Sequence, residues 1–119
     1  MAYSSETASL AVLETVVHLN TVKATGYYLI RCTIPEEVPV SHVSRTLLAA
    51  DWKFRFEETQ AIGQAWIDSR STVALIVPSA VLDVESNVLI NPSHQDFSKL
   101  TFDRPQRLSF DPRLLSRSD

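Results

Sequence analysis

Glycine, cysteine and long apolar runs are all scarce in this sequence, and each shortage excludes a class of protein. Two glycines among 119 residues leave no glycine-rich loop of the kind that cradles phosphate groups. The single cysteine, Cys32, can form no disulfide within the chain and has no metal-type spacing, which favours the reducing cytoplasm. Apolar runs reach only about five residues, whereas a membrane span needs about 20, and no secretory signal is visible.

An excess of positive charge is also missing. The net charge is −3 and the isoelectric point about 5.5, which argues against a nucleic-acid-binding face. His18, His42 and His94 lie far apart without metal-type spacing, so no metal site is expected. What remains is an ordinary globular composition, with 45% hydrophobic and 21% charged residues. The length suits a single domain spanning residues 1–119.

The apolar pattern predicts helices and strands in mixed order. Leu10, Leu13 and Val17 recur at helical spacing, so a helix is expected from the cap-type residues 4–6 to about Leu19. Turn residues and β-branched content delimit the other elements. These are a strand at 27–34, a short helix at 43–50, an alternating segment at 52–56, a helix at 59–69, strands at 72–77 and 87–90, a helical turn at 94–99 and a strand at 108–110. Such a mixture indicates an α/β or α+β fold.

Two core positions follow from these elements. On the expected strand at residues 27–34, Cys32 alternates with Ile30 and Ile34 and shares their face with Tyr28. This face is therefore predicted to point into the core. Trp66, on the expected second helix, is predicted to be a core anchor.

Glu14 falls on the face of the first helix that is expected to be apolar. At 100° per residue it lies at about 40° from Leu10, between Val17 at about 340° and Ala11 at about 100°. A carboxylate in an apolar stripe is costly unless it is paired or has a function. Two interpretations stay open. Glu14 is either a structural residue, which extends from the rim to solvent or pairs with His18 one turn later, or the acid of a functional site.

Polar residues also mark the ends of two expected strands. Pro78 fixes the backbone, so the Ser79 hydroxyl takes a defined position at a strand end, where ligands often bind. No Gly-x-Ser-x-Gly elbow surrounds Ser79, which leaves a ligand-binding serine or a turn serine rather than a nucleophile. Asn87 and Asn91 bracket an apolar run, and Asn91 before proline predicts a turn. Tyr3 is either an exposed terminal side chain or one that folds back over the first helix.

Several motifs resemble those of the RES domain family, in that family's order and along nearly the whole chain. The most specific block is Val77-Pro-Ser-Ala-Val81 followed by Leu89-Ile-Asn-Pro-x-His-x-Asp-Phe97. The supporting matches are Tyr3-x-Ser-Glu6, Ala8–Leu13 with Glu14, Val17-His-Leu19, Thr59–Trp66, Glu85-x-Asn87 and Phe110–Leu115.

The resemblance implies a fold and a function. RES proteins are toxins of bacterial type II toxin–antitoxin systems, with an α+β fold similar to ADP-ribosyltransferase toxins: a mixed sheet with flanking helices. They degrade NAD+ by phosphorolysis or hydrolysis of the nicotinamide–ribose bond. NAD+ is then a substrate rather than a cofactor, and phosphate is a potential co-substrate. The implied partner is a cognate DNA-binding antitoxin whose C-terminal region plugs the active site, and a second copy of the chain is a further potential partner.

By position, the resemblance also assigns three site residues. Glu14 and Ser79 are the implied catalytic residues, with Glu14 beside the positive charge that develops as the glycosidic bond breaks. Tyr3 is implied to stack on nicotinamide, and Ser79 to hydrogen-bond nicotinamide or its ribose. Asn87 and Asn91 are expected to be scaffolding for the serine loop.

The resemblance also carries one departure from the family pattern. The family's phosphate-gripping arginine lies in a segment expected before the position of Met1, and the first arginine here is Arg31. The fold is therefore expected to be N-terminally truncated relative to the family. This leaves two functions: an NAD+-degrading toxin, or a catalytically impaired RES remnant that only binds an antitoxin or dimerises.

Overall fold

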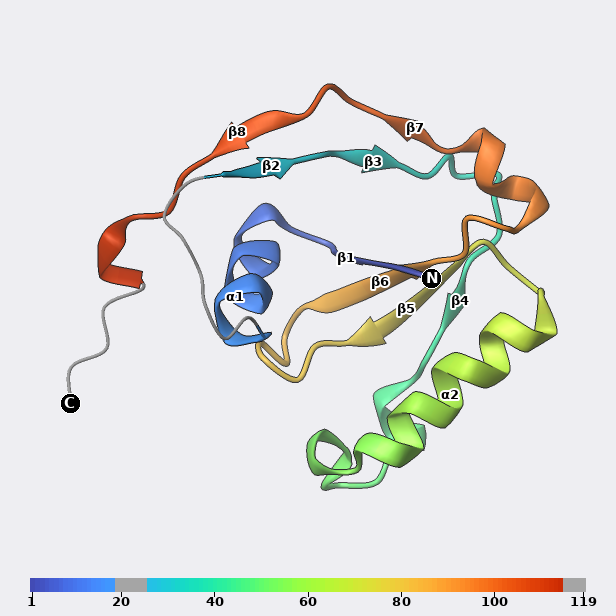
Figure 1. Ribbon diagram of the computed structural model, residues 1–119. Helices are drawn as coiled ribbons and strands as arrows, with labels where there is room; N and C mark the ends of the chain where they lie inside the picture. The colour runs from blue at the N-terminus through green and yellow to red at the C-terminus, as the bar shows by residue number, and fades with distance from the viewer. Residues whose placement is uncertain (19–25, 115–119) are drawn as a thin grey trace.

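A four-stranded mixed sheet forms the centre of the fold, which the computed structural model describes for residues 1–18 and 26–114 (Figure 1). The strand order is β1 (Ala2–Ser5), β6 (Ser86–Ile90), β5 (Ala74–Pro78) and β4 (Ser41–His42). Neighbouring strands are antiparallel except β4 and β5, which run parallel. The predicted α+β class, with a mixed sheet and flanking helices, is confirmed.

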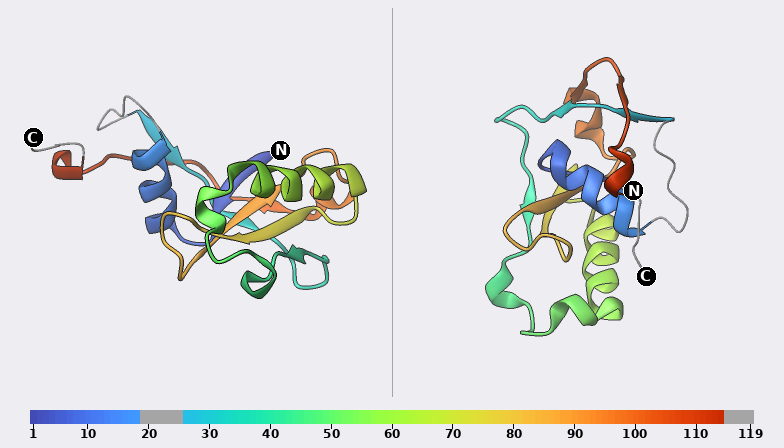
Figure 2. Two further views of the ribbon diagram at one scale, coloured as in Figure 1. Left: turned by 90° about the horizontal axis from the view of Figure 1, so that it is seen from below. Right: turned by 90° about the vertical axis from the view of Figure 1, so that its left-hand side faces the viewer.

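Both faces of this sheet are covered by other elements. Two short antiparallel pairs follow one another and form a ribbon above the sheet, and α1 lies between this ribbon and the end of the sheet (Figure 1). Helix α2 covers the opposite face (Figure 2). The ribbon pairs are β2 (Tyr27–Leu29) with β8 (Gln106–Leu108) and β3 (Cys32–Thr33) with β7 (Thr101–Phe102), and the helices are α1 (Ala8–His18) and α2 (Phe56–Ser69). Four short 3₁₀ helices complete the described part: η1 (Arg45–Leu47), η2 (Trp52–Phe54), η3 (Gln95–Lys99) and η4 (Pro112–Leu114).

Strand alternation divides the core into two buried clusters. Because successive side chains of a strand point to opposite faces, Leu75 and Leu89 pack against Trp66 of α2. Ile90 packs on the ribbon side with Ala74 of β5 and with three residues from outside the strands: Val38, Val73 and Leu100. The predicted role of Trp66 as a core anchor is confirmed, since it is 7% exposed and its indole N–H donates to Thr72 Oγ1 at 2.9 Å.

The expected start of the first helix is wrong. Ser4 and Ser5 belong to β1, where they pair with Val88 and Asn87. The helix is capped instead by Thr7, whose Oγ1 accepts the backbone N–H of Leu10 at 3.1 Å. Serine is a good helix cap, but here the backbone N–H and C=O groups of residues 2–5 form hydrogen bonds with the central strand β6 instead. The expected helix end at Leu19 and the turn after it lie outside the described residues.

The strand expected at residues 27–34 is interrupted, and this changes which side chains face the core. Strand β2 ends at Leu29 and β3 begins at Cys32, while the intervening Arg31 carbonyl accepts the N–H of Asp103 at 2.9 Å. Tyr28 and Ile30 are therefore exposed, at 60% and 52%, against the prediction. Cys32 does pack against the core, and burial raises the pKa of its thiol.

The other boundaries shift by a few residues. The segment at 43–56 forms η1, η2 and the first residue of α2 rather than one short helix and an alternating stretch. The last strand lies at 106–108 rather than 108–110, so Phe110 follows it and stacks on Tyr27, with ring centroids 4.9 Å apart. The expected helical turn at 94–99 is confirmed as η3. No helix in the described ranges is long and apolar enough to cross a membrane.

Candidate functional site

The loop between β5 and β6 builds one end of the candidate site. Within it, the Ser79 N–H donates to the Glu85 carbonyl and the Glu85 N–H to the Leu82 carbonyl, both at 3.0 Å. Side chains from three other segments hold the loop from outside. Thr7 donates to the Glu85 carboxylate at 2.5 Å, Arg45 reaches the Glu85 carbonyl at 3.3 Å, and Lys53 pairs with Asp83 at 3.4 Å. The loop is therefore fixed at several points.

Ser79 is fully buried and oriented by the backbone around it. Its Oγ accepts the N–H groups of Val81 and Leu82, both at 3.1 Å, so the hydroxyl hydrogen must point elsewhere. That hydrogen goes to Glu14 Oε1, at an O···O distance of 2.8 Å. Ser79 is thus a turn serine that also contacts the candidate acid. With 0% exposure, it lies behind Glu14 rather than on the surface of a pocket.

Glu14 reaches this loop from α1 and is half-buried. Its Oε1 accepts a second hydrogen bond from Asn87 Nδ2, at 2.9 Å. Two side-chain donors on one carboxylate oxygen compensate for taking an acid out of water and fix its orientation. This explains how Glu14 is tolerated on the helix face that carries the fully buried Leu10. The alternative that Glu14 pairs with His18 rests on a side chain outside the described part.

Asn87 joins Glu14 to the sheet, a role that the sequence analysis did not assign. It lies on β6, and its Oδ1 accepts the Ser5 hydroxyl of β1 at 2.9 Å. The side chains of Ser5, Asn87, Glu14 and Ser79 therefore form one continuous chain of hydrogen bonds. The sequence does contain a feature that points to this role of Asn87. Its side-chain amide lies at the start of an apolar strand and close in sequence to the loop that carries Ser79. Asn91, by contrast, caps a turn, accepting the Ser93 N–H at 3.0 Å, as predicted.

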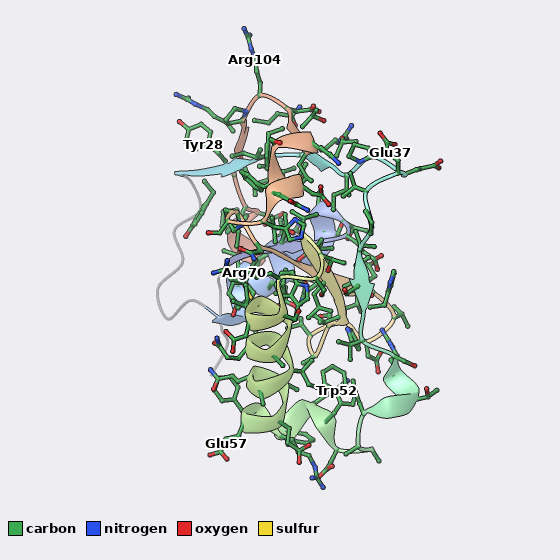
Figure 3. The ribbon with its side chains drawn as sticks, turned by 90° about the vertical axis from the view of Figure 1, so that its right-hand side faces the viewer. Tyr28, Glu37, Trp52, Glu57, Arg70 and Arg104 are labelled. Carbon is green, nitrogen blue, oxygen red and sulfur yellow. The ribbon has the colours of Figure 1, made fainter. Side chains whose placement is uncertain are left out.

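A cavity of about 620 Å³ opens beside this network, between α2 and the sheet. Its size falls in the range of small-ligand sites. Asn87 lines it, with Val77 and Leu89 from the neighbouring sheet positions. The helix side supplies polar and aromatic groups: Phe56, Thr59, Gln60 and Gln64, with Trp52 from η2. Figure 3 shows Trp52 beside the first turns of α2.

Tyr3 lies on the edge strand β1, opposite Leu89 of β6. Its ring is 77% exposed and lines both this cavity and a second one of about 520 Å³ beneath the ribbon. The expectation of an exposed tyrosine is therefore confirmed, although strand pairing rather than a free terminus positions it. Tyr3 belongs to the cavity, whereas Glu14 and Ser79 belong to the network, and Asn87 is common to both.

The comparisons with known proteins define the class of protein. The family model described as RES domain matches residues 1–111, and the chain therefore belongs to the RES domain family. Within the described ranges, no group of three or more His, Cys, Asp or Glu side chains is arranged to hold a metal ion.

Individual relatives are similar over nearly the whole chain. A "Prs ADP-ribosylating toxin" of Sphingobium sp. is 32% identical over 123 residues, which cover 99% of this chain and 76% of that protein. Proteins named "Toxin Res" are 32% identical in Yersinia enterocolitica and 34% identical in Photorhabdus laumondii. These alignments cover 94% and 95% of this chain, and 76% and 74% of the two relatives.

Proposed function

We propose that this chain is a toxin that consumes NAD+ by cleaving the bond between nicotinamide and ribose. The observation that carries the proposal is the half-buried Glu14 carboxylate, which accepts hydrogen bonds from Ser79 and from Asn87, a residue that lines a cavity of about 620 Å³. Membership of the RES domain family and the toxin names of the relatives support it.

The chemistry suits a fixed carboxylate. As the C1′–N bond breaks, its electron pair moves to the pyridinium nitrogen, nicotinamide leaves neutral and positive charge develops on the ribose. The negative charge of Glu14 stabilises this oxocarbenium-like state, and its fixed position avoids reorganisation as the charge appears. An oxygen of water or phosphate then forms the new bond to C1′, and its proton passes to solvent.

The cavity gives the substrate a place to bind. Nicotinamide and its ribose lie at the end near Tyr3 and Asn87, where the ring stacks on the exposed tyrosine. The remainder of the dinucleotide lies along α2, where Trp52 and Phe56 offer aromatic surface and Gln60 offers hydrogen bonds.

A second candidate function differs only in the acceptor. The Sphingobium relative is named an ADP-ribosylating toxin, so a protein nucleophile could replace water or phosphate in the same reaction. Incubation with NAD+ labelled in its adenosine half distinguishes the two, since only transfer leaves label on a protein.

The proposed partner is an antitoxin that covers this site and restrains the toxin, as expected for a type II system. The toxin names of the relatives support it. Co-purification with the product of the adjacent gene tests it, and failure to form a complex would contradict it.

Turnover of NAD+ by the purified chain tests the main proposal. We expect nicotinamide release, measured by chromatography with and without phosphate, and a kcat at least about a hundredfold lower in Glu14→Gln. Glu37→Gln is the matched control, because it makes the same chemical change at an exposed residue that points away from the fold (Figure 3). Absence of turnover at high protein concentration would contradict the proposal and favour a module that only binds a partner.

A further inference from the structure

We propose that Asn87 is the positioning residue for the Glu14 carboxylate and joins it to the wall of the cavity. This inference deepens the proposed function and rests on it, since Glu14 is the group being positioned. Asn87 lies on β6, a central strand paired on both sides, so its backbone is held more firmly than a loop residue would be.

The contacts of Asn87 allow only one orientation of its amide. Nδ2 donates to Glu14 Oε1 at 2.9 Å, and Oδ1 accepts from the Ser5 hydroxyl at 2.9 Å. A flipped amide would set Oδ1 against Oε1, two acceptors without a hydrogen between them. The Ser5 hydroxyl can donate or accept and adapts to the amide. The carboxylate thus fixes the amide, and the amide in turn fixes the carboxylate.

Ser79 completes this arrangement from the other side. Its hydroxyl also donates to Oε1, at 2.8 Å, and its own position is set by two backbone N–H groups. Ser79 is fully buried, however, whereas Asn87 also lines the cavity. Between Ser79 and Asn87, it is therefore Asn87 through which a molecule in the cavity contacts the hydrogen-bond network.

The first test uses kcat and KM to distinguish a residue that positions Glu14 from a residue that binds the substrate. Asn87→Asp keeps the shape and the acceptor for Ser5 but replaces the donor to Glu14 with a carboxylate oxygen. We expect kcat for NAD+ cleavage to fall at least about a hundredfold, with a KM change below about threefold. Ser5→Ala, which removes only the outer hydrogen bond, is expected to lower kcat by about three- to tenfold. A wild-type kcat in Asn87→Asp would overturn the inference.

The adjacent serine provides the matched control. Ser4 also lies on β1, and its hydroxyl donates to the Val88 carbonyl at 2.8 Å, outside the network. Ser4→Ala therefore removes a comparable hydrogen bond from the same strand, and wild-type kcat is expected. Equal losses in Ser4→Ala and Ser5→Ala would mean that the strand is merely weakened, and would overturn the inference.

A spectroscopic test detects the contact between Asn87 and Glu14 without measuring enzyme activity. In a ¹⁵N spectrum of the folded chain, the side-chain NH₂ signals of Asn87 are identified by their loss in Asn87→Asp. They are expected to shift in Glu14→Gln and to stay in place in Ser4→Ala. If wild type releases no nicotinamide but these signals shift, the proposed function fails while the Asn87–Glu14 contact stands. If wild type is active and the signals do not shift in Glu14→Gln, the inference fails while the proposed function stands.

Discussion

At the scale of single residues, the candidate site contains two kinds of side chain. Some fix the position of Glu14 and of the loop between β5 and β6, and others line the cavity. Ser79 is of the first kind. It was predicted as either a ligand-binding or a turn serine, and its contacts are those of a turn serine that also donates to Glu14. Its catalytic role stays a prediction, and its burial means that any effect on NAD+ acts through Glu14.

Replacement of Ser79 by alanine should therefore cost stability as well as activity. Three hydrogen bonds are lost, and one of them is the bond that Ser79 donates to the half-buried Glu14 carboxylate. We expect the free energy of unfolding to fall by about 2 kcal/mol, measured by urea denaturation. Ser98→Ala is the control, since this exposed hydroxyl makes a single bond of 3.5 Å and should change stability by less than about 0.5 kcal/mol. Equal effects would show that Ser79 does not fix the loop.

At the scale of elements, sequence periodicity predicted the helices and strands that their own residues favour. It missed a strand that forms only by pairing with a distant segment of the chain. Helix α2 and the strands at 72–77 and 87–90 carry strong patterns, and the structure contains all three within a few residues. Strand β1 was missed, because its four residues become a strand only through β6. The same pairing places Ser5 beside Asn87, so the outer half of the network could not be predicted either.

Helix α2 contains a glycine whose replacement should stabilise the fold. A Cβ at Gly63 would meet Leu89 Cδ1 at 3.9 Å, an ordinary contact, and glycine inside a helix is unfavourable relative to alanine. Gly63→Ala is therefore expected to raise the free energy of unfolding by about 0.5–1 kcal/mol. Gly26→Ala should lower it by about 1 kcal/mol, because Gly26 has φ of +100°. Thermal or urea denaturation measures both, and a destabilised Gly63→Ala would show that α2 packs too closely on the sheet for a methyl group.

At the scale of the whole molecule, the sheet separates two environments. The face toward the ribbon packs against Val38 and Leu100, whereas the face toward α2 leaves the cavity beside Asn87. Glu14 enters from α1 at the end of the sheet and meets this second face through Asn87. The proposed toxin activity therefore depends on three separate elements, α1, β6 and α2, holding their relative positions.

The two tryptophans report separately on the fold and on this cavity. Trp66 of α2 is buried in the core, whereas the half-buried Trp52 lines the cavity. If NAD+ binds there, its aromatic rings contact Trp52, and titration should quench the tryptophan fluorescence of the wild-type chain. Trp52→Phe should lose this quenching and keep the emission of Trp66, which still reports cooperative unfolding in urea. Quenching that persists in Trp52→Phe would place the substrate elsewhere and direct attention to the second cavity, which Tyr3 and Arg31 both line.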